Sequence, residues 1–128
     1  MRTRFFGQST AELAFAAPFF ILMFLGMVEY GRALMVQHVM TNAAREGAHL
    51  GSLSNVDSSK VQTTVNNFLN SGGLDTAQAR VTISGVNAAS GGQCVVTITY
   101  PYRSIILQLI HFSSDSVTLT ADSSMVHE

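Results

Sequence analysis

The apolar run from Leu13 to Val28 constrains this chain more than any other feature. These 16 residues carry no charge and no strongly polar side chain. A membrane-spanning helix needs about 20 mostly apolar residues, and Gln8–Ala11 and Tyr30–Val36 can extend the run on its two sides. Nine of the 16 are Leu, Ile, Phe or Val, which favour insertion by roughly 3 to 5 kcal/mol before proline and glycine are discounted. We therefore predict a transmembrane helix over about residues 13–31.

Basic residues near the N-terminus predict how this helix is oriented. Arg2 and Arg4 precede the run closely, and such residues tend to stay on the cytoplasmic side. Arg32 on the other side weakens the bias without reversing it. We expect a single-pass protein with a cytoplasmic N-terminus and an exported C-terminal part.

Three interpretations of the N-terminus compete. A cleaved secretory signal needs a small-residue cleavage site after the apolar run, and the sequence EYGRALMVQH that follows Val28 offers none. An uncleaved anchor accounts for the run but leaves Glu12 unexplained, because an ionisable residue against hydrocarbon is costly. The third interpretation is a signal whose helix remains in the mature protein after cleavage.

That third interpretation follows from the sequence MRTRFFG-QSTAE, which resembles a type IV prepilin signal. A short basic leader ends at Gly7, and Glu12 is the fifth residue after the cut. Cleavage would give Gln8 a new α-amine with a pKa near 8 and so a positive charge. Glu12 lies one helical turn away on the same face, so this amine, or that of a neighbouring subunit, can partner the carboxylate in hydrocarbon.

The longer stretch from Gly7 to about Leu50 resembles the TadE-like proteins, which are pseudopilins of tight-adherence (Tad) pilus systems. The elements that carry the resemblance are Glu12-Leu13-Ala14, Pro18, Glu29-Tyr30-Gly31-Arg32 and Asn42-Ala43-Ala44-Arg45-Glu46-Gly47-Ala48, with a looser likeness in the tail TADSSMVHE. The resemblance implies the bacterial inner membrane and the following partners: a prepilin peptidase, the platform proteins of the pilus, other pilins and pseudopilins, and membrane lipid.

Several helix positions are candidates for packing or anchoring. Pro18 removes a backbone donor and predicts a mild kink, and Gly26 is a further small position in the span. Tyr30 is an amphipathic anchor at headgroup depth. Glu29 and Arg32 are three residues apart and can pair, either as an exposed pair of little energetic value or as a contact with another pilin.

Small residues recur beyond the span. Ala43, Gly47 and Gly51 form one row at spacings of four, and Ala44 and Ala48 form another. Such rows permit close helix approach. They face either the core of the exported domain, which we favour, or another subunit.

The remaining residues predict a small α+β domain. Asp57-Ser58-Ser59 offers a helix cap, Val61, Val65, Phe68 and Leu69 share one helix face, and Gly72-Gly73 ends the pattern.

Alternating residues over Arg80–Val86 and Gln93–Tyr100 predict a β-hairpin. Pro101 should end its second strand. Ser104–Phe112 is ambiguous between a short helix and a buried segment. Ser116–Ala121 should be a third strand.

Residues typical of catalysis or metal binding are not arranged for it. No histidine has ligand spacing to Cys94 or to another histidine, and GxSxG, phosphate loops and dinucleotide fingerprints do not occur. Cys94, on the inner face of a predicted strand, is expected to be a small buried apolar residue. The seven Lys and Arg are scattered and the net charge is −1, which argues against nucleic acid. We expect no enzyme activity, cofactor or metal.

These observations combine into one hypothesis. Residues 1–7 are a prepilin-type leader, residues 8–52 a long N-terminal helix that contains the span, and residues 53–128 an exported pilin-like domain with a three-stranded antiparallel sheet and short helices. The function is that of a pseudopilin, or minor pilin, in assembly of a Tad-type pilus or a related secretion apparatus. The alternative is an uncleaved, membrane-anchored exported binding domain without a pilus role.

Overall fold

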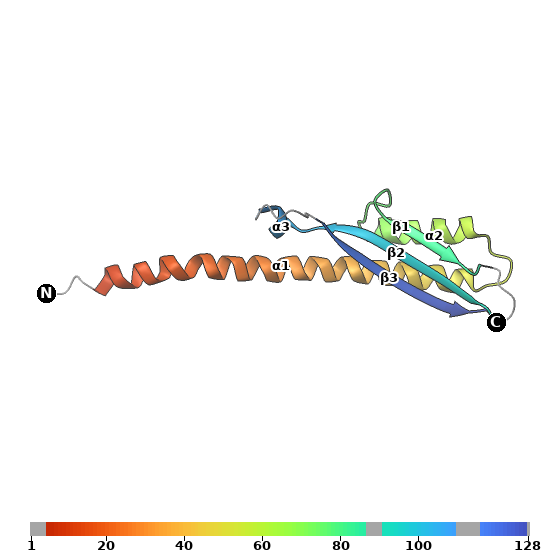
Figure 1. The fold of residues 1–128 in the computed structure, drawn as a ribbon, viewed down its shortest axis with the longest axis horizontal. Coiled ribbons are helices and arrows are strands. Elements are labelled where there is room, and N and C mark those ends of the chain that lie inside the picture. The colour runs from red at the N-terminus through yellow and green to blue at the C-terminus, as the bar shows by residue number, and fades with distance from the viewer. Residues whose placement is uncertain (1–4, 87–90, 110–115, 128) are drawn as a thin grey trace.

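The computed structural model describes residues 5–86, 91–109 and 116–127. Its dominant element is α1 (Phe5–Gly51), a single helix of 47 residues that is about 70 Å long at 1.5 Å per residue. The helix continues without interruption through Pro18. Figure 1 shows that the other elements lie along the C-terminal half of α1, whereas its N-terminal half projects alone.

The small domain has two short helices and one sheet. Along the chain they are α2 (Ser58–Ser71), β1 (Arg80–Ser84), β2 (Gln93–Arg103), α3 (Ile105–Leu109) and β3 (Ser116–Val126). The sheet has the order β1-β2-β3 and is antiparallel throughout. The predicted fold class, a long N-terminal apolar helix followed by a three-stranded antiparallel sheet with short helices, is confirmed.

The core lies where α2 and the sheet pack on the second half of α1. Its buried members alternate along β2 and recur at helical spacing in α2, as the sequence patterns require. The largest fully buried side chains are Met40, Val61, Val65, Leu69, Cys94, Val96 and Ile98. A hydrogen bond from Gln37 Nε2 to the carbonyl oxygen of Thr120, at 3.0 Å, also ties α1 to β3.

Two details of the domain differ from the sequence-based expectation for single residues. Phe68 is 43% exposed, although it was expected to share the buried face of α2 with Leu69. The narrow contact with α1 is already filled by Val61, Val65 and Leu69. Pro101 does not end β2, which continues to Arg103. Because β1 pairs with β2 only as far as Thr99, β2 has an open side beyond it, where a missing N–H breaks no ladder bond.

The C-terminal elements also extend or resolve what the sequence left open. β3 runs to Val126 rather than ending at Ala121, because β2 offers it pairing partners from Arg103 back to Gln93. The ambiguous segment Ser104–Phe112 contains α3, and residues 110–112 lie outside the described part of the chain. It is the continuation of β2 to Arg103, paired with Ser116 of β3, that carries α3 toward the bare half of α1 (Figure 1).

Candidate membrane-spanning and packing surface

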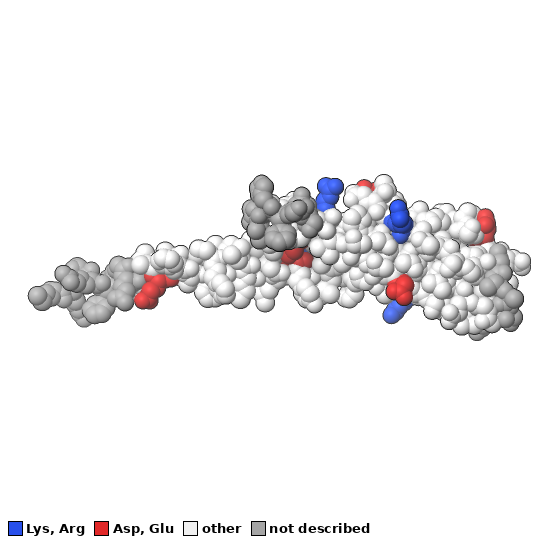
Figure 2. Space-filling model, viewed as in Figure 1, with Lys and Arg blue, Asp and Glu red and all other residues white. Residues whose placement is uncertain are grey.

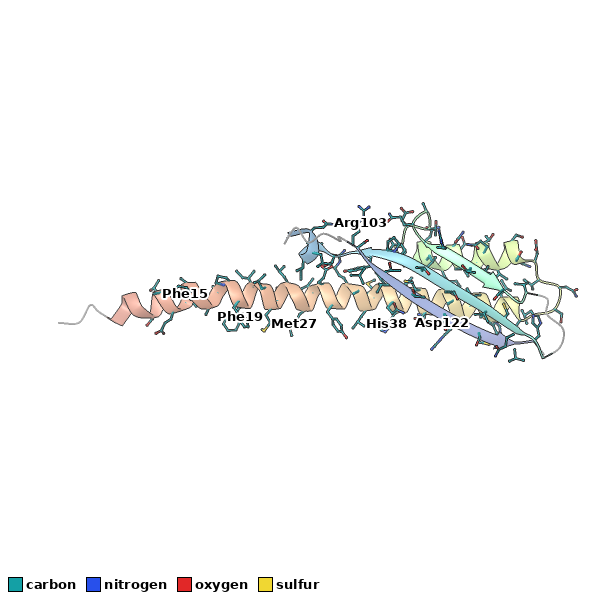
Figure 3. The ribbon with its side chains drawn as sticks, in the orientation of Figure 1. Phe15, Phe19, Met27, His38, Arg103 and Asp122 are labelled. Carbon is teal, nitrogen blue, oxygen red and sulfur yellow. The ribbon has the colours of Figure 1, made fainter. Side chains whose placement is uncertain are left out.

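The N-terminal half of α1 is apolar and uncovered. Phe15 is 88% exposed, and large apolar side chains from Leu13 to Met35 are exposed on all sides of the helix. Figure 3 shows Phe15, Phe19 and Met27 pointing away from the helix with no other element beside them. On the face that Figure 2 shows, this stretch of the surface is mostly white.

This exposure determines what kind of environment α1 needs. Within the described residues, one helix, Ser9–Gly51, is long and apolar enough to cross a membrane, and its most apolar window is not buried in the protein. Each large apolar side chain left in water forgoes about 1.5–3 kcal/mol of burial free energy. The bare half of α1 is therefore a candidate membrane anchor, and it does not pack against the core of its own domain.

The predicted processing residues lie at the start of this helix. Gly7 and Gln8 are within the first two turns of α1, whose first helical residue is Phe5. Glu12 is exposed, and it stands one turn after Gln8, at a rise of about 6 Å. A helical backbone therefore places the Glu12 carboxylate on the face of α1 that runs back to the amide nitrogen of Gln8.

The small residues of α1 fall into two groups. Gly26 and Gly31 face open space, since a methyl group added at either would meet no atom within 4 Å. At Gly47, by contrast, an added methyl would lie 2.5 Å from Cγ2 of Val65, and at Gly51 it would lie 2.5 Å from Sγ of Cys94. The second group is thus occupied by the domain, while the first remains available to a partner helix.

The predicted packing element around residue 45 is divided between two environments. Ala43, Ala44 and Gly47 lie in the core beneath α2 and β2. Arg45 and Glu46 are exposed on the other side of the helix. Only the first three contribute to the packing of the domain on α1.

Glu29 joins α1 to the end of β2 and the start of α3. Its Oε1 accepts a hydrogen bond of 2.8 Å from the hydroxyl of Tyr102 and one of 3.2 Å from the backbone N–H of Ile105. Its Oε2 lies 3.5 Å from Nη1 of Arg32. The Glu29 side chain is only 13% exposed, so the pair with Arg32 is one part of a partly buried cluster within the chain. We call Glu29, Arg32, Tyr102 and Ile105 the Glu29 cluster.

Tyr102 is the member of this cluster whose ionisation the surroundings change most clearly. Burial raises the pKa of its hydroxyl, and the hydrogen bond to the Glu29 carboxylate and the charge of that carboxylate raise it further. Arg32, whose guanidinium carbon lies 6.0 Å from the centre of the Tyr102 ring, opposes the shift. The protonated hydroxyl is therefore the stable form, and it donates to Glu29.

Sequence reasoning found Glu29 and Arg32 but missed Tyr102 and Ile105. The expected strand end at Pro101 placed Tyr102 outside the sheet, so its position opposite α1 was not considered. Its signal in the sequence was that Tyr102 continues the alternation that runs through Cys94, Val96 and Ile98. A backbone donor such as the Ile105 N–H carries no residue-specific signal at all.

The described residues also show how the nucleophilic and metal-ligating side chains are placed. They contain no group of three or more His, Cys, Asp or Glu side chains placed to hold a metal ion. Cys94 is fully buried and unpaired, and burial raises the pKa of its thiol. It is held as an uncharged thiol in the core, where it fills the space above Gly51.

The comparisons with known proteins concern the helix alone. Neither a curated protein nor a solved structure matches the chain. The family model of TadE-like proteins matches residues 7–49, and this family suggests a minor pilin-like protein associated with Tad pili. The matched segment contains the predicted processing residues, the bare apolar half of α1 and the small residues of its packed half. The match over residues 7–49, most of the N-terminal helix, confirms the resemblance to TadE-like proteins that the sequence predicted.

Proposed function

We propose that this chain is a pseudopilin, or minor pilin, of the bacterial inner membrane that takes part in assembly of a Tad-type pilus or a related secretion apparatus. The observation that carries the proposal is the division of α1: its second half holds the domain, and its first half is apolar and bare. A pilin subunit needs this division, because its helix must lie in lipid before assembly and among other helices afterwards.

The N-terminus of the proposed subunit is made by a prepilin peptidase that cuts between Gly7 and Gln8. Glycine before the cut and Glu12 after it support this step, as does the TadE-like match that begins at residue 7. Cleavage leaves a cationic amine on Gln8, one turn from the exposed carboxylate of Glu12. In the membrane the two charges partner each other, and in a filament the carboxylate can instead partner the amine of a neighbouring subunit.

Assembly in this proposal uses helix-to-helix packing along the bare half of α1. Gly26 and Gly31 lie in open space there, and small residues let two helices approach closely. The partners are other pilins and pseudopilins, with the membrane platform proteins inserting the subunit. The domain is exported, on the side of the membrane opposite Arg2 and Arg4.

The N-terminus of the protein isolated from cell membranes tests the processing step. Intact-mass spectrometry in a strain with an active prepilin peptidase should show a chain that starts at Gln8, and Gly7→Ala should retain the seven-residue leader. Gly26→Ala is the matched control, because it makes the same change in the same helix and the added methyl group has no atom within 4 Å. This variant should be processed normally.

The same measurement separates the proposal from an uncleaved anchor. A full-length chain in both wild type and Gly7→Ala would refute processing and leave a single-pass, membrane-anchored exported domain. Cleavage at Gln8 makes co-purification with filament components the next measurement, and Glu12→Ala should then reduce recovery in filaments while leaving the mature N-terminus unchanged.

A further inference from the structure

α3 lies beside α1 at the point where the apolar run of α1 ends. The run finishes at Val28, and the next residue, Glu29, binds the first backbone N–H of α3 at Ile105 and the hydroxyl of Tyr102 just before it. Figure 1 shows α3 at the end of the domain that faces the bare half of α1. If the apolar run is in the bilayer, these two bonds hold α3 within a few side-chain lengths of the lipid.

Two large apolar side chains are exposed among the described residues at this end of the domain. Ile105 is 57% exposed at the start of α3. Val117, also exposed, lies in β3 directly opposite Tyr102. Ile106 and Leu107 of α3 are half-buried. Exposed apolar side chains beside the end of an apolar span match the interior edge of a headgroup layer, where amphipathic elements bury their apolar faces.

Two cations accompany this apolar surface. Arg32 follows the span by one turn of α1, and Arg103 ends β2 beside α3. Both arginines are among the residues that line a pocket of about 350 Å³, together with Tyr100 and Tyr102. Guanidinium groups bind phosphate through paired hydrogen bonds, and arginines at headgroup depth attract anionic lipids.

We propose that α3, the adjoining start of β3 and the two arginines form a second membrane contact, with Ile105 and Val117 at the acyl boundary and Arg32 and Arg103 on the phosphates of anionic lipids. The domain then lies against the lipid surface, held in a defined tilt, instead of standing free on α1. The inference rests on the proposed function only in placing the bare half of α1 in the bilayer.

Depth-dependent fluorescence quenching tests this contact in the full chain. A fluorophore is attached at Ile105→Cys in vesicles of phosphatidylcholine and phosphatidylglycerol, some of which carry a spin label on the acyl chain near the headgroup. The buried thiol of Cys94 stays unlabelled in the folded protein, which unmodified wild type verifies. Met23→Cys in the span is the positive control, and Asn67→Cys on the exposed side of α2 is the negative control.

The proposal predicts that spin-labelled lipid quenches the fluorophore at residues 23 and 105 but not at 67. Quenching of the fluorophore at residue 23, with as little quenching at residue 105 as at residue 67, would overturn the second contact and leave the anchor intact. Absence of quenching at 23 would overturn both the contact and the membrane placement on which the proposed function depends. Quenching at 105 that falls as the ratio of protein to lipid rises would show that a second copy of the chain, not lipid, covers this surface.

The arginine part of the proposal has its own comparison. Vesicles of phosphatidylcholine alone should show reduced quenching at 105, and Arg103→Gln should reproduce that reduction in vesicles that contain phosphatidylglycerol. Arg45→Gln, an exposed arginine on the packed half of α1, should leave the quenching unchanged. Equal quenching in both lipids would overturn recognition of anionic headgroups.

Discussion

Replacing Tyr102 by phenylalanine should destabilise the domain through the loss of one oxygen atom. The hydroxyl donates a 2.8 Å bond to the carboxylate of Glu29, and Tyr102 is only 6% exposed, so water cannot easily replace the bond. Hydrogen bonds to charged groups contribute about 1.5–3 kcal/mol. Because Glu29 keeps its bonds to the Ile105 N–H and to Arg32, we expect a loss of free energy of unfolding near the lower end, about 1.5–2 kcal/mol.

The lone thiol of the chain provides the assay. Cys94 is fully buried and lies on β2, the strand that also carries Tyr102, so it reacts with a maleimide only when the sheet opens. The reaction rate is measured across a urea series on the full chain in detergent micelles, and two-state behaviour of so small a domain converts the midpoints into free energies. The midpoint of Tyr102→Phe should fall below that of wild type.

A matched variant and a double-mutant cycle make the result specific to the Glu29 cluster. Tyr30→Phe removes the same atom from an exposed tyrosine of α1, and its unfolding midpoint should not move. In the Glu29→Ala background, Tyr102→Phe should cost at least about 1 kcal/mol less than in wild type. A loss below about 0.5 kcal/mol for Tyr102→Phe, which is within the usual range of neutral surface changes, would refute the bond as a stabilising contact.

Three further predictions concern the free energy of unfolding; the first two use the same assay, and the third, at a pH where maleimides hydrolyse, uses circular dichroism across a urea series. Gly47→Ala should lower the free energy of unfolding by about 1–2 kcal/mol, because the added methyl group meets an α2 valine at 2.5 Å and overpacking costs more than the gain in helix propensity. Gly31→Ala, in open space, should not destabilise the domain, and equal effects of the two variants would contradict the packing at Gly47. Leu69→Ala should cost about 2–5 kcal/mol and Phe68→Ala clearly less, since Leu69 is buried and Phe68 is 43% exposed; the reverse order would place the wrong face of α2 on α1. The pKa of Tyr102 is raised in the folded state, so the contribution of its hydroxyl to the free energy of unfolding is complete below the unfolded pKa of about 10 and is lost as the pH rises through the folded pKa. Wild type should therefore lose stability above pH ~10 more steeply than Tyr102→Phe does, and parallel plots of stability against pH for the two proteins would contradict this.

The sequence predicted the elements of this fold better than their ends. The apolar run, the alternation over Arg80–Val86 and Gln93–Tyr100, and the apolar spacing of Val61 and Val65 are local patterns, and each correctly predicted the type of its element. The predicted end of β2 at Pro101 was wrong. A proline is tolerated in a strand whose neighbour has already ended, and where that neighbour, β1, ends relative to Pro101 depends on the pairing of the two strands.

The candidate site shows the same difference between what local sequence patterns predict and what depends on distant contacts. The apolar character of the first half of α1 was evident from the sequence, as was the possibility that Glu29 pairs with Arg32. What the sequence could not supply was the second partner of Glu29, since Tyr102 lies 73 positions further along the chain. Nor could it show that Gly47 and Gly51 are occupied by the domain while Gly26 and Gly31 are open, because the neighbours of a glycine along the chain do not show what packs against it.

The sequence by itself determined that α1 is a candidate membrane anchor, because it contains an uncharged apolar run long enough to approach the thickness of a bilayer. It also determined that the remaining residues form short helices and strands, because the spacing of apolar residues is a local property of the chain. Only the tertiary structure decided which half of α1 the domain covers, and that the β2–β3 ribbon reaches back to Glu29. Those outcomes depend on strand register and on contacts between distant residues, for which a linear sequence contains no direct signal.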